Sequence, residues 1–195
     1  MIFHRLIRRL VYNYIRTEES IANNKVKQGS NSKISYPCIL GHEELIIIGN
    51  NTRILDNARL QLYPEYVQVQ PHIRIGDNCL IGYRFCVLAA ADVDIGDNVL
   101  MASDVTIVSH NHGFDLKKKE VFMDQPLTVA PVKIGNNVWI GDKVIILSGV
   151  EIGDNVVIGA GAVVTKDIPS NCIGVGNPMK IIKKFDDQLQ KWIKQ

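Results

Sequence analysis

The segment Val108-Ser109-His110-Asn111-His112-Gly113 holds two of the chain's five histidines, placed two residues apart. Histidine is the side chain whose ordinary pKa allows it to take up or release a proton near neutral pH, so this pair is a candidate for general acid–base chemistry. The segment ends a run of regularly spaced aliphatic residues and begins the longest interruption of that spacing. The regular spacing therefore indicates which elements hold the two histidines.

The composition is that of a single globular domain. The chain has 195 residues, of which 46% are hydrophobic, and this is enough for one substantial core. A net charge of only +2 argues against a general nucleic-acid binder. The four cysteines lack CxxC spacing, so we expect reduced thiols in a cytoplasmic protein.

Residues 1–33 are predicted to be a helix and a connector that precede the regular part of the chain. Apolar side chains recur at helical spacing over residues 2–16, with arginines on much of the remaining surface. Arg5, Arg8 and Arg9 interrupt the apolar run, so neither a signal peptide nor a membrane span fits. The helix either packs on the scaffold or a neighbouring subunit, or rests through residues 1–16 on an anionic membrane surface.

A tetrapeptide of the form Ile-Gly-Asn/Asp-Asn occurs five times, beginning at Ile48, Ile75, Ile95, Ile134 and Ile152. An aliphatic residue or Met follows each leading isoleucine after six and after twelve residues. A period of six fits a short strand plus a turn, with the leading aliphatic inward and Gly or Asn where the backbone is left-handed. Three such faces make a triangular coil, and stacked coils bury one aliphatic column. The sequence thus predicts an all-β solenoid.

The repeat register also predicts where loops leave the solenoid. Within each triplet the spacing is an unbroken six, whereas the step from the third face to the next first face is 15, 8, 27 and 6 residues. All insertions therefore leave from one corner, which is where a rigid scaffold would place a binding site. The longest loop, residues 113–133, follows His112 directly. Its run Lys117-Lys118-Lys119 is either a solvated face or a ligand site.

These patterns divide the chain into three parts. We expect the β-solenoid domain over residues 34–170, with residues 113–133 as its projecting loop. Residues 171–195 are expected to form a turn and a closing amphipathic helix, because apolar residues recur there at helical spacing. Those residues are Ile181, Ile182, Phe185, Leu189 and Trp192.

The segments IGNNVWIG and IGAGAVVTKDIP, together with the SHNHG loop, resemble the hexapeptide-repeat acetyltransferases. The similarity is to the branch that contains maltose and galactoside acetyltransferases and O-acetyltransferases of capsule and lipopolysaccharide biosynthesis, and it covers roughly residues 48–184. The resemblance implies a left-handed parallel β-helix, whereas the period alone leaves right-handed solenoids open. It also implies a homotrimer with sites between subunits, acetyl-CoA as co-substrate and no metal.

The resemblance assigns roles to single residues. Alignment of the repeat at Ile95 puts the family's catalytic histidine on His112, as general base, and leaves His110 structural or supporting. The Gly141-Asp142 turn would donate a backbone N–H to the oxyanion, although Asp142 replaces a serine common in relatives. Trp139 is either an interface residue or a contact at the acyl or acceptor end. The implied coenzyme contacts are Trp139, Gly141, Asp142, Ala160, Gly161, Thr165, Lys166, Lys180 and Lys183, and the candidate acceptor contacts are Asn111 and Arg84.

The residues that would bind the acceptor differ from those of galactoside-type relatives. Galactoside-type relatives bind their sugar acceptor through an Asn and an Asp, at positions where this chain has Gly82 and Ala90. The overall form is more similar to surface-polysaccharide enzymes, so we expect transfer to a sugar hydroxyl of a small or lipid-linked acceptor. Streptogramin acetylation and amino-sugar N-acetylation are alternatives. A γ-type carbonic anhydrase, which needs three converging histidines, and a non-catalytic scaffold are alternatives from other classes.

Overall fold

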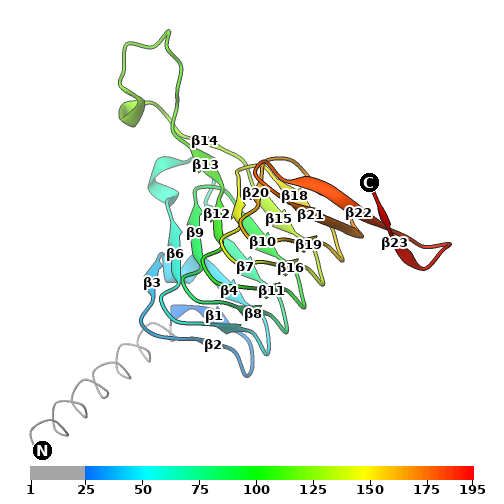
Figure 1. Ribbon diagram of the computed structural model, residues 1–195. Helices are drawn as coiled ribbons and strands as arrows, with labels where there is room; N and C mark the ends of the chain where they lie inside the picture. Colours follow the sequence, from blue (N-terminus) through cyan, green and yellow to red (C-terminus); the bar gives the residue numbers. More distant parts are fainter. Residues whose placement is uncertain (1–24) are drawn as a thin grey trace, which may run out of the picture.

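The computed structural model describes residues 25–195, and these form a three-sided prism of stacked β-coils (Figure 1). The predicted amphipathic helix over residues 2–16, with its possible membrane contact, lies outside the described residues. No helix within residues 25–195 has both the length and the apolar character needed to cross a membrane.

Three sheets of parallel strands form the three faces of the prism. The first sheet contains β1 (Lys27–Gln28), β4 (Ile46–Ile48), β7 (Ile73–Ile75), β10 (Val93–Ile95), β15 (Val132–Ile134) and β18 (Glu151–Ile152). The second contains β2 (Lys33–Ile34), β5 (Arg53–Ile54), β8 (Leu80–Ile81), β11 (Leu100–Met101), β16 (Trp139–Ile140), β19 (Val157–Ile158) and β21 (Cys172–Val175). The third contains β3 (Ile39–Gly41), β6 (Arg59–Leu62), β9 (Cys86–Ala89), β12 (Thr106–Val108), β17 (Ile145–Ile146) and β20 (Val163–Val164). The chain visits the three faces in turn, so neighbouring strands of one sheet are one coil apart.

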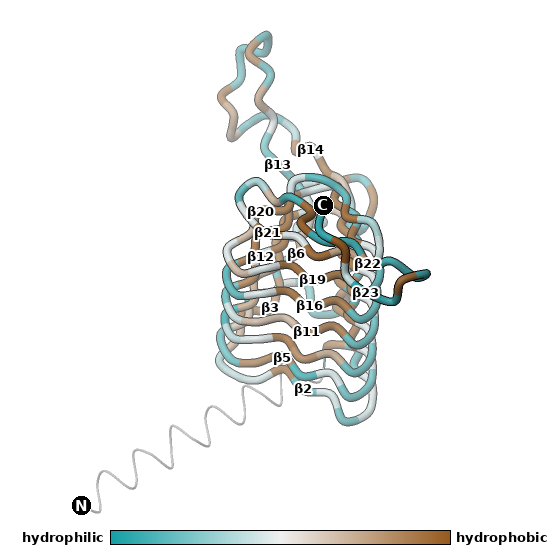
Figure 2. The backbone as a smooth tube through the Cα atoms, turned by 45° about the vertical axis from the view of Figure 1, so that its right-hand side comes forward, coloured by the Kyte–Doolittle hydropathy of each residue, from teal (hydrophilic) through white to brown (hydrophobic). Residues whose placement is uncertain are grey.

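The predicted aliphatic column is confirmed. The leading isoleucines pair in register from coil to coil, as in Ile48 with Ile75 and Ile95 with Ile134. These isoleucines, and the residues six and twelve places after each, are at most 3% exposed. Figure 2 shows hydrophobic residues recurring at matching places on successive coils. Each coil thus covers the apolar interior of the next, as a solenoid requires.

Glycine and asparagine of the tetrapeptide serve different purposes at the corner between the first and second sheets. Each closing asparagine has a left-handed backbone, with φ values from 53° to 57° at the five copies. The glycines are needed for close approach: a Cβ at Gly135 would lie 2.8 Å from the carbonyl carbon of Gly153 on the next coil. The following residue then bonds across coils, since the Asn136 N–H donates to Asp154 Oδ1 at 2.6 Å.

The C-terminal segment is a strand pair, and the predicted closing helix is wrong. β22 (Lys180–Asp186) pairs antiparallel with β21, and β23 (Lys191–Lys194) pairs antiparallel with β22. The edge of the second sheet supplies backbone partners that favour a strand. The Asp186 carboxylate accepts hydrogen bonds from the N–H groups of Gln188 (2.9 Å) and Leu189 (2.8 Å), which closes the turn. Phe185 then packs opposite Trp192, with ring centroids 5.4 Å apart.

The predicted domain boundaries also shift. Strand β1 lies in the predicted connector and β2 begins at its last residue, and both strands already pair with the coil of β4 and β5. At the other end, β21 continues the second sheet past residue 170. The prism therefore extends beyond 34–170 on both sides, because short segments without the tetrapeptide can still add strands to an exposed sheet edge. The handedness of the coil stays a prediction.

The two long insertions leave the corner between the third and first sheets, which we call the loop corner (residues 63–72, 90–92 and 109–131). The first insertion contains the 3-10 turn η2 (Pro64–Tyr66), and η1 (Glu43–Leu45) lies between β3 and β4, at the same corner on the preceding coil. In the second, β13 (His110–Asn111) pairs antiparallel with β14 (Thr128–Val129), and η3 (Phe122–Asp124) lies between them. Residues 110–129 of this second insertion project from the prism as an arm (Figure 1).

Candidate active site

His112 lies in a pocket between the arm and the first insertion. The pocket has a volume of about 460 Å³ and is lined by Tyr63 and Tyr66, by His110 and His112, and by residues 123–127 of the returning arm. The His112 side chain is exposed, so a small molecule in the pocket can reach the imidazole. Three segments that are distant in the sequence meet here because all of them leave the loop corner.

His110 lies deeper in the same pocket than His112. Its ring packs edge-on against Tyr63, with centroids 5.4 Å apart, and its buried Nδ1 has no hydrogen-bond partner among the described residues. Burial lowers the pKa of His110 most strongly. The nearby backbone of Leu88 raises this pKa, and the neighbouring His112 lowers it. His110 therefore favours the neutral imidazole, and its contacts are those of a supporting residue.

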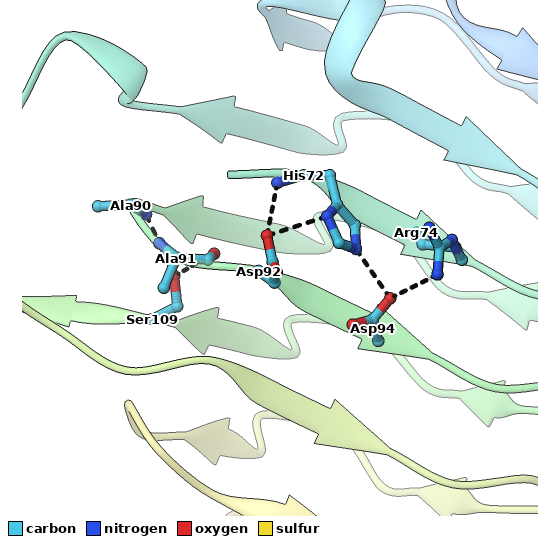
Figure 3. Close-up of polar contacts among 7 residues, drawn as sticks. All are labelled: His72, Arg74, Ala90, Ala91, Asp92, Asp94 and Ser109. Atoms are coloured by element: carbon cyan, nitrogen blue, oxygen red, sulfur yellow. Dashed lines mark hydrogen bonds and ion pairs between the residues drawn. The ribbon is translucent and has the colours of Figure 1, made fainter. Parts of the chain in front are cut away.

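Ser109 anchors the start of the arm. The fully buried Ser109 hydroxyl accepts hydrogen bonds from the N–H groups of Ala90 (3.1 Å) and Ala91 (3.0 Å) and donates to the Ala91 carbonyl (2.8 Å) (Figure 3). Its backbone carbonyl also accepts from the Ala130 N–H at 3.0 Å. The hydroxyl uses its one donor and both acceptor sites, so the chain just before His110 is fixed.

A charged cluster ties this anchor to the end of the first insertion. The Nδ1 atom of His72 lies 2.9 Å from Asp92 Oδ1, and its Nε2 lies 3.0 Å from Asp94 Oδ1 (Figure 3). The backbone N–H of His72 also donates to Asp92 at 3.1 Å, and Arg74 lies 3.4 Å from Asp94. Residues 90–92 are thus held on one side by Ser109 and on the other by His72.

Gln125 organises the arm on the other side of His112. Its side chain is buried, at 4% exposure, and lines the histidine pocket. The amide oxygen accepts a hydrogen bond from the Asp115 N–H (2.9 Å), and the amide nitrogen donates to the carbonyls of Asp115 (3.2 Å) and Glu120 (3.1 Å). Sequence reasoning missed Gln125, Tyr63 and Tyr66. The only sequence signal for the two tyrosines is that their insertion shares a corner with His112.

A second group of predicted residues lies at the corner between the second and third sheets, which we call the turn corner (residues 82–85, 102–105, 141–144 and 159–162). The N–H of Gly141 donates within the ladder to the Ile158 carbonyl, and that of Gly161 donates to the Asp142 carbonyl. Within residues 25–195 the N–H groups of Asp142 and Ala160 donate to no protein acceptor. A Cβ added to Gly161, where φ is +71°, would meet nothing within 4 Å. This open backbone with two spare donors fits an amide-containing chain such as pantetheine.

Two charged residues of the turn corner are engaged with the scaffold. Asp142 Oδ1 accepts a hydrogen bond from the Ser103 N–H at 3.0 Å, so this carboxylate caps the turn of the previous coil. Arg84 forms a two-pronged pair with Asp104, at 2.6 Å from Nε and 2.8 Å from Nη2. This hydrogen bonding lowers the pKa of Asp104 and raises that of Arg84. An acceptor role for Arg84 stays a prediction.

The sequence matches two family signatures. Residues 131–166 match the family described as "Bacterial transferase hexapeptide (six repeats)", and residues 72–108 match "Hexapeptide repeat of succinyl-transferase". Galactoside O-acetyltransferase of Escherichia coli is 38% identical over 79% of this chain and 74% of its own length. WbbJ of E. coli, named for O-acetyl transfer in lipopolysaccharide biosynthesis, is 32% identical over 93% of both chains. The chain belongs to the hexapeptide-repeat acetyltransferases.

A solved structure of a galactoside acetyltransferase in complex with coenzyme A resembles this acetyltransferase with a TM-score of 0.59 at 28% identity. The match covers 93% of this chain and 76% of that one. A relative from Saccharomyces cerevisiae is 42% identical over 64% of this chain, and the chain spans 62% of that protein's length.

The remaining predicted residues of the acetyltransferase lie on the second sheet, on the C-terminal strand pair and near the loop corner. Trp139, on β16 of the second sheet, is 55% exposed, and Lys180 and Lys183 are exposed on β22. Thr165 and Lys166 are exposed at the loop-corner edge after β20. A single chain therefore places His112 and the Asp142 amide on different corners of the prism.

The other predicted acceptor residue, Asn111, is exposed beside His112 in β13, and its backbone carbonyl accepts from the Thr128 hydroxyl at 3.4 Å. Among residues 25–195, no group of three His, Cys, Asp or Glu side chains is placed to hold a metal ion.

Proposed function

We propose that this protein transfers the acetyl group of acetyl-CoA to a sugar hydroxyl, with His112 as the general base. The observation that carries this proposal is the exposed His112 imidazole in a pocket whose surrounding backbone is fixed by buried polar side chains. Membership of an acetyltransferase family supplies the donor class. The match with WbbJ over 93% of both chains supports an acceptor in surface-polysaccharide biosynthesis.

The proposed reaction is a direct transfer. The acceptor hydroxyl gives its proton to His112 as its oxygen attacks the thioester carbonyl carbon. The carbon–sulfur bond then breaks, and the proton on His112 passes to the leaving sulfur. The N–H of Asp142 is the donor proposed to stabilise the oxyanion, because it has no acceptor among the described residues.

We infer that this site forms between two subunits of a homotrimer. The separation of His112 and Asp142 on two corners of one prism supports this inference, because the turn corner of one subunit facing the loop corner of the next would bring the two groups together. Lys166, Lys180 and Lys183 are exposed cations, and they are the proposed contacts for the phosphates of coenzyme A. Sedimentation that finds a stable, active monomer would contradict the interfacial site.

The acceptor is tested by a screen with radiolabelled acetyl-CoA. The panel contains monosaccharides, oligosaccharides, amino sugars and streptogramins at equal concentration. The proposal predicts label in an alkali-labile ester on a saccharide. Label that stays on an amino sugar after alkali, or that appears only on a streptogramin, would refute the sugar O-acetyltransferase assignment.

A further inference from the structure

We propose that Gln125 is a positioning residue that sets the orientation of His112, an inference that rests on the proposed role of His112 as base. Within residues 25–195, Gln125 is the only buried polar residue of the arm. Ser109, which is also buried, directly precedes the arm. It lines the same pocket as both histidines. A polar side chain that is 4% exposed on a projecting arm is costly unless all its hydrogen bonds are made.

The three hydrogen bonds of Gln125 fix the chain immediately after His112. Two of them go to the N–H and the carbonyl of Asp115, three residues beyond His112, and the third goes to the carbonyl of Glu120. Together they close residues 115–125 into a loop around one side chain. Only two residues lie between His112 and Asp115, so the backbone between them has few possible conformations.

Packing brings Gln125 closer still to the proposed base. A Cβ added to Gly113 would lie 2.6 Å from the Cβ of Gln125 and 2.9 Å from the Pro126 carbonyl oxygen. The residue that follows His112 therefore lies directly against Gln125, with no room for a larger side chain. A shift of Gln125 would move the backbone that carries the imidazole.

The chemistry of the contact requires an amide. The site needs one acceptor, for the Asp115 N–H, and two donors, for two carbonyl oxygens, and a primary amide supplies both kinds. An ionised carboxylate of the same shape keeps the acceptor but faces two carbonyl oxygens without a proton. Protonation of that carboxylate restores one donor. A thioether of similar length supplies neither donor.

The test compares Gln125→Glu and Gln125→Met with the unaltered enzyme in steady-state kinetics across pH. We expect Gln125→Met to lower kcat roughly ten- to a hundredfold, because small misplacement of a catalytic group has effects of this size, with little change in KM for acetyl-CoA. We expect the kcat of Gln125→Glu, divided by that of the unaltered enzyme, to rise as pH falls, whereas the same ratio for Gln125→Met stays flat. A kcat within twofold of the unaltered value for both variants, or a flat ratio for Gln125→Glu, would overturn the proposal.

Hydrogen exchange provides a readout that does not depend on activity. In Gln125→Met the Asp115 amide should exchange faster, while the amides of the prism strands keep their protection and show that the variant is folded. Unchanged protection at Asp115 would contradict the proposed contact. If His112→Ala retained activity, the proposed function would fail, but the exchange result at Asp115 would still report on Gln125.

Discussion

The buried hydroxyl of Ser109 and the buried amide of Gln125 fix the main chain three residues before and three residues after His112. Ser109 bonds to the backbone of residues 90 and 91, and Gln125 bonds to the backbone of residues 115 and 120. His112 itself is exposed. The arrangement gives an accessible imidazole on a restrained backbone, which suits a general base that must meet both an acceptor and a thioester.

Replacing Ser109 by Ala should lower the free energy of unfolding by about 1–3 kcal/mol, because the buried N–H of Ala90 and the partly buried N–H of Ala91 lose their acceptor. Chemical denaturation at fixed protein concentration measures the change. Ser148→Ala is the matched control, since the Ser148 hydroxyl makes one long bond of 3.3 Å to Ala130 at the same corner. Equal effects of the two substitutions would contradict the anchoring role of Ser109.

Acidification should weaken the fold through His110. Burial holds the pKa of His110 below its ordinary value of 6.5, so the unfolded chain binds a proton there before the folded chain does. The stability that His110 contributes is therefore present above pH 6.5 and is lost as pH falls from 6.5 through the lower folded pKa. The urea midpoint of the unaltered protein should fall between pH 7.5 and 5.5 by more than that of His110→Asn. The same fall in both proteins would remove His110 as the cause.

Lys166→Ala should weaken coenzyme A binding several-fold at low salt, because an exposed lysine neutralises phosphate as a point charge. The difference from the unaltered enzyme should shrink at high salt, as the charge is screened. Calorimetric titration with coenzyme A at two ionic strengths measures both effects. Lys119→Ala, which removes an exposed lysine from the arm, serves as the control and should leave the affinity unchanged. Unchanged affinity in Lys166→Ala would refute the phosphate contact.

The scaffold could be predicted from the sequence because its determinants repeat. Each leading isoleucine, and each residue six or twelve places later, meets the same neighbours in every coil. All five copies of the repeat therefore indicate the same buried environment. The position of His112 at the loop corner followed from the same register. The different roles of Gly135 and Asn137 could not be predicted from the repeat, because close approach between coils and a left-handed φ both favour small residues at a turn.

The pocket and the C-terminus depend on contacts that no period encodes. Tyr63 meets the histidines only because two insertions fold side by side, and Gln125 meets them because the arm folds back on itself. At the C-terminus, the seven-residue interval between Phe185 and Trp192 fits two turns of a helix as well as facing positions of a hairpin. The open edge of the second sheet favours strands here. That edge exists only in the folded prism, so the sequence pattern does not indicate it.

The most direct test of His112 as the general base is acetyl transfer by His112→Ala, measured beside its affinity for acetyl-CoA and its sedimentation. We predict a loss of kcat of roughly 10²–10⁴-fold, as expected when a general base is removed, with acetyl-CoA affinity and oligomeric state unchanged. Transfer at the unaltered rate by a folded, acetyl-CoA-binding His112→Ala variant would contradict the assignment of His112 as the base.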